Sequence, residues 1–313
     1  MTNHRIPTLG VLLALAAALL FGLNASTTKV IIQSGMTAEQ VVFIRSLFSA
    51  VIALIWALIA NRGALRLEKR MIPRLLLLGV VGVGGLQWTY SLAVVMLPVG
   101  IALLIEYTAV LWVPLILMLF FSESIKRQIW LGAALVLGGL AIVGQVWDSS
   151  LDPVGVFWAF AAAASLTVYF ILGQRVQLTL PTNVTMFYGM SISAVLFFFA
   201  SDWGSFDFGR LAEPQNLMGN LSSYELPLWV ALIWLGIFGS FLPMAFSYLA
   251  LRHLSATIVG IIATSETVLA FFFALLWLNE VITFVQALGG IVVVIGILIA
   301  QTARKQSQVK AVD

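Results

Sequence analysis

Two glutamates lie inside long apolar stretches of the sequence, and they are the residues with the most distinctive chemistry. Glu106 interrupts the apolar stretch 99–121, and Glu266 interrupts the stretch 255–277. A carboxyl group is expensive to bury in hydrocarbon, so it faces a cavity or a partner group. Such a group is able to bind a substrate ammonium or to exchange a proton, and Glu106 is the stronger candidate. The alternative is a structural carboxyl group that is hydrogen-bonded between helices.

Neutral polar and aromatic residues accompany these glutamates and form a candidate lining for a small-molecule site. They are Asn24, Gln87, Trp88, Tyr90, Tyr107, Trp112, Tyr169, Thr264 and Ser265. An apolar pocket with a few polar groups is the usual form of a small-ligand site. Trp and Tyr are also common at membrane–water boundaries, which is the alternative for the aromatic residues. Trp88 and Trp112 lie inside their apolar stretches, which favours the cavity.

Arg45 is a third charged residue within an apolar stretch, about one helical turn inside residues 40–60. As a fixed cation, it is able to neutralise a substrate carboxylate. The favoured interpretation is structural, because long basic side chains extend toward water. In this interpretation, the guanidinium extends to the outer membrane–water interface or pairs with Glu39.

The elements that must position these residues are ten apolar stretches, each close to the ~20 residues that a helix needs to cross a bilayer. They cover residues 9–30, 40–60, 74–96, 99–121, 129–147, 154–174, 183–202, 228–250, 255–277 and 283–301. The whole chain is 61% hydrophobic and 9% charged, whereas soluble domains are about 25% charged. The composition therefore predicts an all-α membrane protein with ten transmembrane helices.

The stretch from residue 78 to residue 142 is repeated 157 positions later, without a gap, as Gly79 and Gly236 show. The other matched pairs include Gly82 and Gly239, Leu97 and Leu254, Glu123 and Glu280, Gly132 and Gly289, and Gly139 and Gly296. Each half has five spans, an odd number, so the second half enters the membrane from the opposite side. We therefore predict two inverted repeats, residues 8–147 and 153–301, followed by a cytoplasmic tail at 302–313. Inverted repeats are typical of secondary transporters, which alternate access to a central site.

The basic residues predict the orientation in the membrane. Thirteen of the 16 lie between spans on one side, namely Arg5, Arg62, Arg66, Lys69, Arg70, Arg74, Lys126, Arg127, Arg175, Arg252, Arg304, Lys305 and Lys310. Positive residues stay in the cytoplasm. Both chain ends are therefore expected in the cytoplasm, with the protein in a cytoplasmic membrane. The net charge of +3 does not indicate nucleic-acid binding, because the basic residues lie between apolar stretches.

The residue inventory argues against several classes of chemistry. The sequence contains no cysteine, and its two histidines, His4 and His253, lie at the ends of spans. No metal centre, cofactor or pairing of a nucleophile with a base is therefore expected, so an enzyme is not predicted. The sequence also has no phosphate-binding loop, which argues against direct coupling to ATP.

Two prolines and one long connection shape the predicted spans. Pro114 and Pro243 each remove a backbone donor and free the carbonyl four residues earlier, on Val110 and Gly239. Static bends are the favoured interpretation, with gating hinges as the alternative. The connection 201–227 is rich in Gly, Asn and Ser, and an irregular loop is favoured there over a lid or an interfacial helix.

Several of these features recur in a known group of transporters. Each half has an Ala-rich first span and a Leu-Ala pair, Leu92-Ala93 or Leu249-Ala250, and then an apolar helix that ends at a glutamate followed by glycines. This pattern resembles the drug/metabolite transporter superfamily, specifically its EamA branch of ten-span bacterial transporters. Residues 104–109 are similar to a first-half motif of that branch, whereas Thr267 stands where many members have proline. The resemblance implies export of amino acids and other small metabolites, often driven by protons.

The sequence thus predicts a secondary transporter that exports a small metabolite by alternating access. An amino acid or a related zwitterion is the leading substrate class, and proton antiport is one form of coupling that fits. The expected partners are the substrate, protons and the lipid bilayer, with the chain acting as a monomer or a homodimer. Two alternatives stay open: a carrier for other metabolites or amphiphilic drugs, and a scaffold or sensor that moves no solute.

Overall fold

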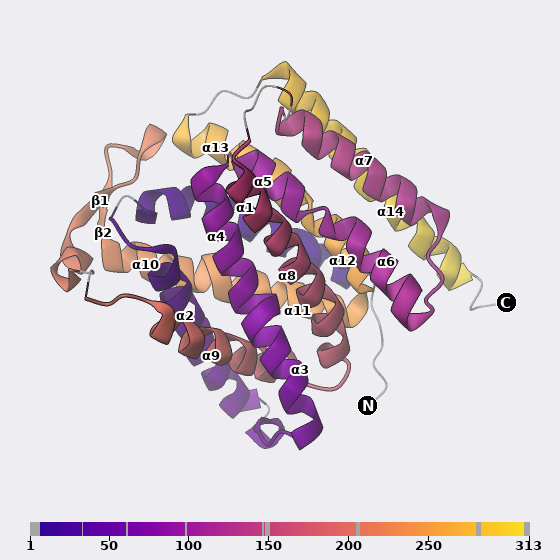
Figure 1. Ribbon diagram of the computed structural model, residues 1–313, viewed down its shortest axis with the longest axis horizontal. Helices are drawn as coiled ribbons and strands as arrows, with labels where there is room; N and C mark the ends of the chain where they lie inside the picture. Colours follow the sequence, from indigo (N-terminus) through magenta and orange to yellow (C-terminus); the bar gives the residue numbers. More distant parts are fainter. Residues whose placement is uncertain are drawn as a thin grey trace.

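The protein is a bundle of helices (Figure 1). The structure, a computed structural model, describes residues 7–32, 34–60, 62–97, 99–145, 147, 151–204, 207–279 and 283–309. Within these residues, eight helical segments are long and apolar enough to cross a membrane, and two shorter apolar helices complete the set of ten. The prediction of an all-α membrane protein with ten transmembrane helices is confirmed.

The first five spans contain one bend and one break. Span three passes through a π-helical segment, η3, and span four is divided between α5 and α6. The elements are α1 (Pro7–Ile32), α2 (Ala38–Ala60), η1 (Arg62–Leu65), η2 (Lys69–Met71), α3 (Ile72–Leu77), η3 (Leu78–Gly85), α4 (Leu86–Met96), α5 (Val99–Glu106), α6 (Ala109–Phe121) and α7 (Arg127–Val143).

The second five spans show the same irregularities in the same order. Span eight passes through the π-helical segment η7, and span nine is divided between α12 and α13. The elements are α8 (Pro153–Gln177), α9 (Thr182–Ala200), α10 (Leu228–Gly236), η7 (Ile237–Phe241), α11 (Leu242–His253), α12 (Ala256–Ala263), α13 (Ser265–Leu278) and α14 (Phe284–Val309).

The 157-residue offset found in the sequence also relates the helix boundaries. Moving α5 by 157 positions gives residues 256–263, which are the bounds of α12. Moving α4 gives 243–253, one residue shorter than α11. The π-helical segment and the broken span therefore occur at equivalent positions of the two halves. The two five-helix repeats are thus present in the three-dimensional structure as well as in the sequence.

The repeats interleave rather than sitting side by side as two bodies. Helix α1 of the first half packs on α11, α12 and α13 of the second, and α8 of the second packs on α4, α5 and α6 of the first. The first helix of each repeat thus lies against the broken span of the other repeat. This exchange places α1 beside the second break, between α12 and α13, and α8 beside the first break, between α5 and α6.

Helices α7 and α14 form the closest pair in the bundle and lie along one side of it (Figure 1). A methyl group on Gly132 would lie 2.7 Å from the carbonyl oxygen of Gly296, and one on Gly139 would lie 2.8 Å from that of Gly289. Each approach is closer than a side chain permits, so glycine is required for the packing. The close approach of these two helices therefore depends on glycines that recur at the 157-residue offset.

The long connection after α9 is more regular than the sequence indicated. Strands β1 (Pro214–Asn216) and β2 (Glu225–Pro227) form an antiparallel hairpin. The short helix η5 (Phe208–Ala212) precedes β1, and the short helix η6 (Gly219–Leu221) lies in the connection between the two strands. The hairpin is fixed to α13, where Trp277 Nε1 donates to the Leu217 carbonyl and Asn220 Nδ2 donates to the Leu276 carbonyl. The expected irregular loop is therefore wrong for this part of the connection, because contacts with a distant helix order it.

The boundaries predicted for the two repeats, residues 8–147 and 153–301, stay predictions, because the helix bounds do not define where one repeat ends and the next begins. Residues 302–309 of the predicted tail continue α14 as a helix. Residues 1–6 and 310–313 lie outside the described part of the chain, as does Glu280.

Candidate functional site

Both broken spans are interrupted by the same side-chain chemistry. The hydroxyl of Thr108 donates to the Ile105 carbonyl at 2.6 Å, and the hydroxyl of Ser265 donates to the Ile262 carbonyl at 2.7 Å. These pairs are related by the 157-residue offset. A Ser or Thr side chain that binds a backbone carbonyl of the preceding turn competes with the helical bond and bends the helix. Each break thus forms with no proline inside it, including the second, where Thr267 stands.

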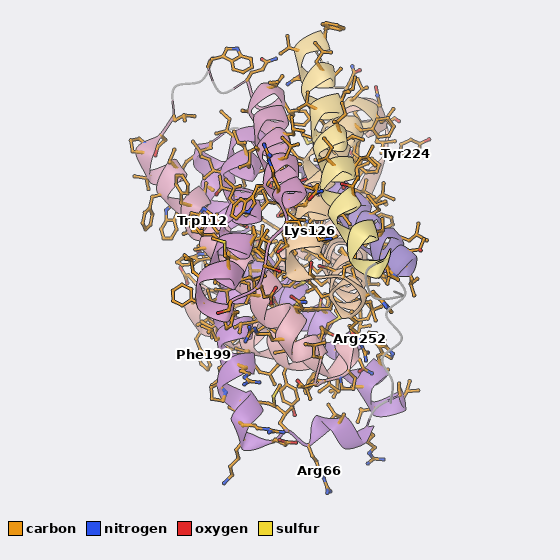
Figure 2. The ribbon with its side chains drawn as sticks, turned by 90° about the vertical axis from the view of Figure 1, so that its right-hand side faces the viewer. Arg66, Trp112, Lys126, Phe199, Tyr224 and Arg252 are labelled. Atoms are coloured by element: carbon orange, nitrogen blue, oxygen red, sulfur yellow. The ribbon has the colours of Figure 1, made fainter. Side chains whose placement is uncertain are left out.

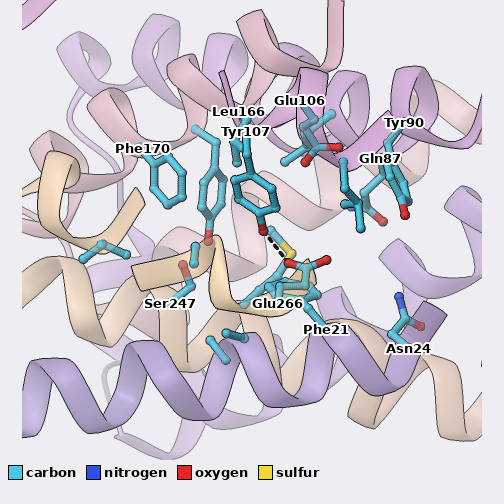
Figure 3. Close-up of a pocket in the computed structure, with 18 of the residues that line it drawn as sticks. Phe21, Asn24, Gln87, Tyr90, Glu106, Tyr107, Leu166, Phe170, Ser247 and Glu266 are labelled. Carbon is cyan, nitrogen blue, oxygen red and sulfur yellow. Dashed lines mark hydrogen bonds between the residues drawn. The ribbon is translucent and has the colours of Figure 1, made fainter. Parts of the chain in front are cut away.

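The two breaks face one cavity at the centre of the bundle (Figure 3). The empty space between its lining atoms is about 830 Å³, including its mouth. The lining is mostly apolar, with polar groups from both repeats. Its polar and aromatic members are Phe21, Asn24, Arg45, Gln87, Tyr90, Glu106, Tyr107, Tyr169, Phe170, Ser247 and Glu266.

The cavity brings together most of the residues that the sequence singled out. Glu106, Glu266, Asn24, Tyr90, Tyr107 and Tyr169 all line it, as does Gln87. These residues come from α1, α4, α8, the first break and α13. Residues more than a hundred positions apart therefore converge on one site, although their binding role stays a prediction.

The two glutamates occupy different environments within this cavity. Glu266 is in the first turn of α13 and accepts a hydrogen bond from the Tyr107 hydroxyl at 2.6 Å. Glu106 is the last residue of α5, its side chain is buried, and its Oε2 atom has no hydrogen-bond partner among the described residues. The Tyr107–Glu266 bond joins the two helix breaks directly (Figure 3).

Arg45 is buried in the same cavity, which corrects the favoured interpretation from the sequence. Its Nε atom donates to Ser240 Oγ at 2.6 Å, and its Nη2 atom donates to the Gly239 carbonyl at 2.8 Å. Its guanidinium therefore points into the bundle and bonds to residues of η7, rather than extending toward water or pairing with Glu39. The Gly239 carbonyl is the group that Pro243 was predicted to free, so this arginine replaces the helical bond that the proline removes.

Two further cavity residues have buried polar atoms without partners among the described residues. Both amide atoms of Gln87 and the Oδ1 atom of Asn24 make no hydrogen bond. Buried amide groups are normally satisfied by protein or by ordered water. Unpaired groups that line a cavity are therefore available to a bound molecule or to water.

Sequence reasoning missed Phe21, Phe170, Met244 and Ser247, which also line the cavity. The repeat contained a signal for two of them. Ser247 is 157 positions after Tyr90, and Met244 is 157 positions after Gln87. Matched faces of α4 and α11 thus line the same cavity, so the symmetry partner of each candidate was itself a candidate.

The structure does not bring Trp88 and Trp112 to the cavity. The indole nitrogen of Trp88 donates to Glu39 Oε1 at 2.8 Å, and its ring lies near Trp158. Trp112 stacks on Phe160 and lies at an edge of the bundle (Figure 2). Both residues are inside spans, as expected, but depth in the membrane does not fix which face of a helix meets the cavity.

Ten membrane helices in two repeats, with broken helices around a central cavity that contains a few polar groups, form the architecture of a secondary transporter. The matches to known proteins agree with that class. Residues 8–145 and 153–302 each match the EamA-like transporter family, and the chain belongs to this family. The predicted resemblance is therefore confirmed, and the protein is a membrane transporter of this family.

Three comparisons illustrate the relationship. The threonine/homoserine exporter RhtA of Escherichia coli K12 is 29% identical over 80% of this chain and 78% of its own length. The pseudopaline exporter CntI of Pseudomonas aeruginosa is 28% identical over 95% of this chain and 97% of its own. A solved crystal structure that is 17% identical superposes with a TM-score of 0.76 over 95% of this chain and 98% of the other, which shows the shared fold.

Proposed function

We propose that this protein exports a small zwitterion, such as an amino acid, across the cytoplasmic membrane by alternating access. The observation that carries the proposal is the central cavity in which each broken span places a carboxyl group, Glu106 or Glu266. A substrate ammonium between these groups would replace water with two acidic partners. The names of two relatives, exporters of threonine and homoserine and of pseudopaline, support a small metabolite as the cargo.

Glu266 is the better-prepared partner for the ammonium. A helix N-terminus favours a negative charge, and Glu266 lies in the first turn of α13. The Tyr107 hydroxyl also holds its Oε2 atom in place. An oriented carboxylate binds a cation with less loss of side-chain entropy than a free one.

Glu106 is the candidate for the proton in an antiport cycle. It lies at the C-terminal end of α5, where the helix dipole opposes a negative charge. Its Oε2 atom is buried and unpaired within the described structure. A carboxyl group in that position is suited to alternate between binding a proton and binding the ammonium.

Matched contacts between the repeats support alternating access. A methyl group on Gly10 would lie 2.7 Å from Leu254 Cγ, and one on Gly155 would lie 2.8 Å from Leu97 Cγ. Leu97 and Leu254 are equivalent in the repeat, and the two contacts join the first helix of each half to the other half. We infer that they close opposite ends of the cavity, so that one opens while the other stays packed.

The orientation is part of the same proposal. Figure 2 places Arg66, in the basic connection after α2, at one end of the bundle and Tyr224, in the hairpin, toward the other. Positive connections stay in the cytoplasm. The hairpin then faces the periplasm, and both chain ends face the cytoplasm.

The test is transport by purified protein in proteoliposomes loaded with the proteinogenic amino acids and L-homoserine. Mass spectrometry of the released solutes identifies any cargo, and an opposing proton gradient tests the coupling. The expected result is selective release of one or a few amino acids that accelerates when protons are able to move inward. If protein-containing and empty liposomes release every solute equally, the protein is not an exporter of this class.

A further inference from the structure

Arg45 has more hydrogen-bond donors than its protein partners use. A guanidinium has five N–H donors in a planar fork. Ser240 Oγ takes the Nε donor and the Gly239 carbonyl takes one Nη2 donor, and both acceptors lie on one edge of the fork. The end edge, made of Nη1 and the second Nη2 hydrogen, has no acceptor among the described residues. Arg45 lines the cavity, so this edge is open to a solute.

Among the described residues, the guanidinium has no carboxylate partner within ion-pair distance. The acidic groups of the cavity are Glu106 and Glu266, and neither forms an ion pair with it in the described structure. The charge of Glu266 interacts with the guanidinium across the cavity and offsets part of the cost of burying it. A ligand carboxylate at the end edge would offset more of that cost.

The repeat shows that the fold does not need a side chain at this position. Gly79 packs on Ile192, and its equivalent Gly236 packs on Phe48. Phe48 and Ile192 are therefore equivalent, and an offset of 144 positions relates α2 to α9. Adding 144 to Arg45 gives Gly189.

Each of the three charged residues of the cavity is equivalent to an uncharged small residue in the other repeat. Glu106 corresponds to Ala263 and Glu266 to Ala109, since the offset there is 157. Each charge thus exists in one repeat and is replaced by Gly or Ala in the other. The symmetric scaffold forms without them, which indicates that the charges serve the solute.

We propose that Arg45 is the carboxylate-binding residue of this cavity, and that the Gly239 carbonyl and Ser240 hydroxyl turn its end edge toward the solute. A carboxylate accepts two parallel hydrogen bonds from such an edge. The inference rests on the proposed export of a zwitterion and adds which end of the solute is recognised by which group. The cavity then selects amino acids against amino alcohols, which keep the ammonium and lack the carboxylate.

Pro243 is a positioning residue in this arrangement. It frees the Gly239 carbonyl that holds Arg45. In Pro243→Ala, a new N–H at position 243 competes for that carbonyl and loosens the guanidinium. The expected effect is a higher solute concentration at half-maximal transport for the amino acid and an unchanged value for the amino alcohol.

The experiment uses the full-length protein in proteoliposomes with paired probes, each proteinogenic amino acid and the amino alcohol in which CH₂OH replaces its carboxylate. A bidentate contact with a charged group contributes about 1.5–3 kcal/mol, so wild type is expected to prefer its amino acid about ten- to a hundredfold. Arg45→Gln abolishes that preference, and Arg45→Lys keeps the charge but recovers only part of it, because lysine lacks the fork.

Arg210→Gln is the matched control, because Arg210 also donates to a backbone carbonyl, that of Ser34, but lies on the surface outside the cavity. It is expected to keep the preference. If Arg45→Gln does not fold, Ser240→Ala decides, since it removes only the Nε acceptor and should weaken amino-acid transport alone. Transport of amino acids with unchanged preference in the folded Arg45 or Ser240 variants overturns the inference and leaves the proposed function standing. Failure of wild type with every amino acid overturns both.

Discussion

The two helix breaks are built alike but present opposite helix ends to the cavity. At the first break, Glu106 is the last residue of α5, at the C-terminal end of that helix. At the second break, Glu266 lies in the first turn of α13, at its N-terminal end. The hydroxyl groups of Thr108 and Ser265 bend both spans in the same way. The backbone is therefore symmetric, while the electrostatic setting of the two glutamates is not.

This difference teaches how a symmetric scaffold supports two roles. The dipole of a helix stabilises a negative charge at its N-terminus and disfavours one at its C-terminus, each by about 0.3–1 kcal/mol at exposed sites and more when partly buried. Glu266 has the favourable end and the Tyr107 donor, whereas Glu106 has neither. The comparison is the basis on which we propose a fixed cation-binding role for Glu266 and an exchangeable proton for Glu106.

The largest expected effect comes from removing the charge at the second break. In Glu266→Gln the substrate ammonium loses its oriented partner, and truncating one member of a buried charge pair costs about 2–5 kcal/mol. Amino-acid counterflow should fall at least about thirtyfold. Glu225→Gln, on the exposed hairpin strand, is the control with the same chemical change. Normal counterflow in Glu266→Gln would refute the assignment.

Glu106→Gln should separate amino-acid exchange across the membrane from the coupling of export to proton movement. A glutamine neither binds nor releases a proton at this site, so the acceleration by an inward proton gradient should disappear. Counterflow, which needs no net proton movement, should fall less than about tenfold, because Glu266 still binds the ammonium. The measurement is efflux with and without the gradient. A variant that still responds to the gradient would move the proton role to another residue.

Tyr107→Phe should produce a smaller loss, because it removes the hydrogen bond that orients Glu266 but keeps the ring. A hydrogen bond to a charged group contributes about 1.5–3 kcal/mol, and part of this is regained when water enters the cavity. The concentration at half-maximal transport should rise about tenfold. Tyr188→Phe is the control, since its hydroxyl donates to the Leu65 carbonyl outside the cavity. Equal effects in both variants would indicate a general loss of packing.

The smallest effect is expected for Trp112→Phe. This residue is in the span that carries the first break, but it stacks on Phe160 at the edge of the bundle. Losing part of that contact should lower the melting temperature slightly, while transport changes less than about twofold. Selective loss of transport at unchanged melting temperature would place Trp112 in the substrate path.

Local patterns of the sequence were sufficient for the scaffold. Apolar stretches of membrane length predicted ten spans, and the 157-residue offset predicted the repeat. Hydropathy and small-residue spacing act within one helix or between closely matched neighbours, so the chain records them directly. The same reasoning located Glu106 and Glu266, because a carboxyl group in hydrocarbon needs a special environment wherever the helix packs.

Contacts between distant segments required the tertiary structure. The hydrogen bond from Arg45 to Ser240 spans 195 positions, and that from Tyr107 to Glu266 spans 159. Hydropathy placed Arg45 near a boundary because nothing local shows that the carbonyl freed by Pro243 lies within its reach. The hairpin after α9 was missed for a related reason, since the carbonyl and indole groups that fix it involve α13.

The sequence by itself therefore determined the number of spans, the repeat and the buried carboxyl groups, all of which follow from the energy of placing residues in hydrocarbon. Only the tertiary structure decided which helix faces meet. It turned Trp88 and Trp112 away from the cavity and turned Arg45 into it. The physical reason is that helix rotation and bending depend on packing and hydrogen bonds between repeats, and these are not encoded in the polarity of any single span.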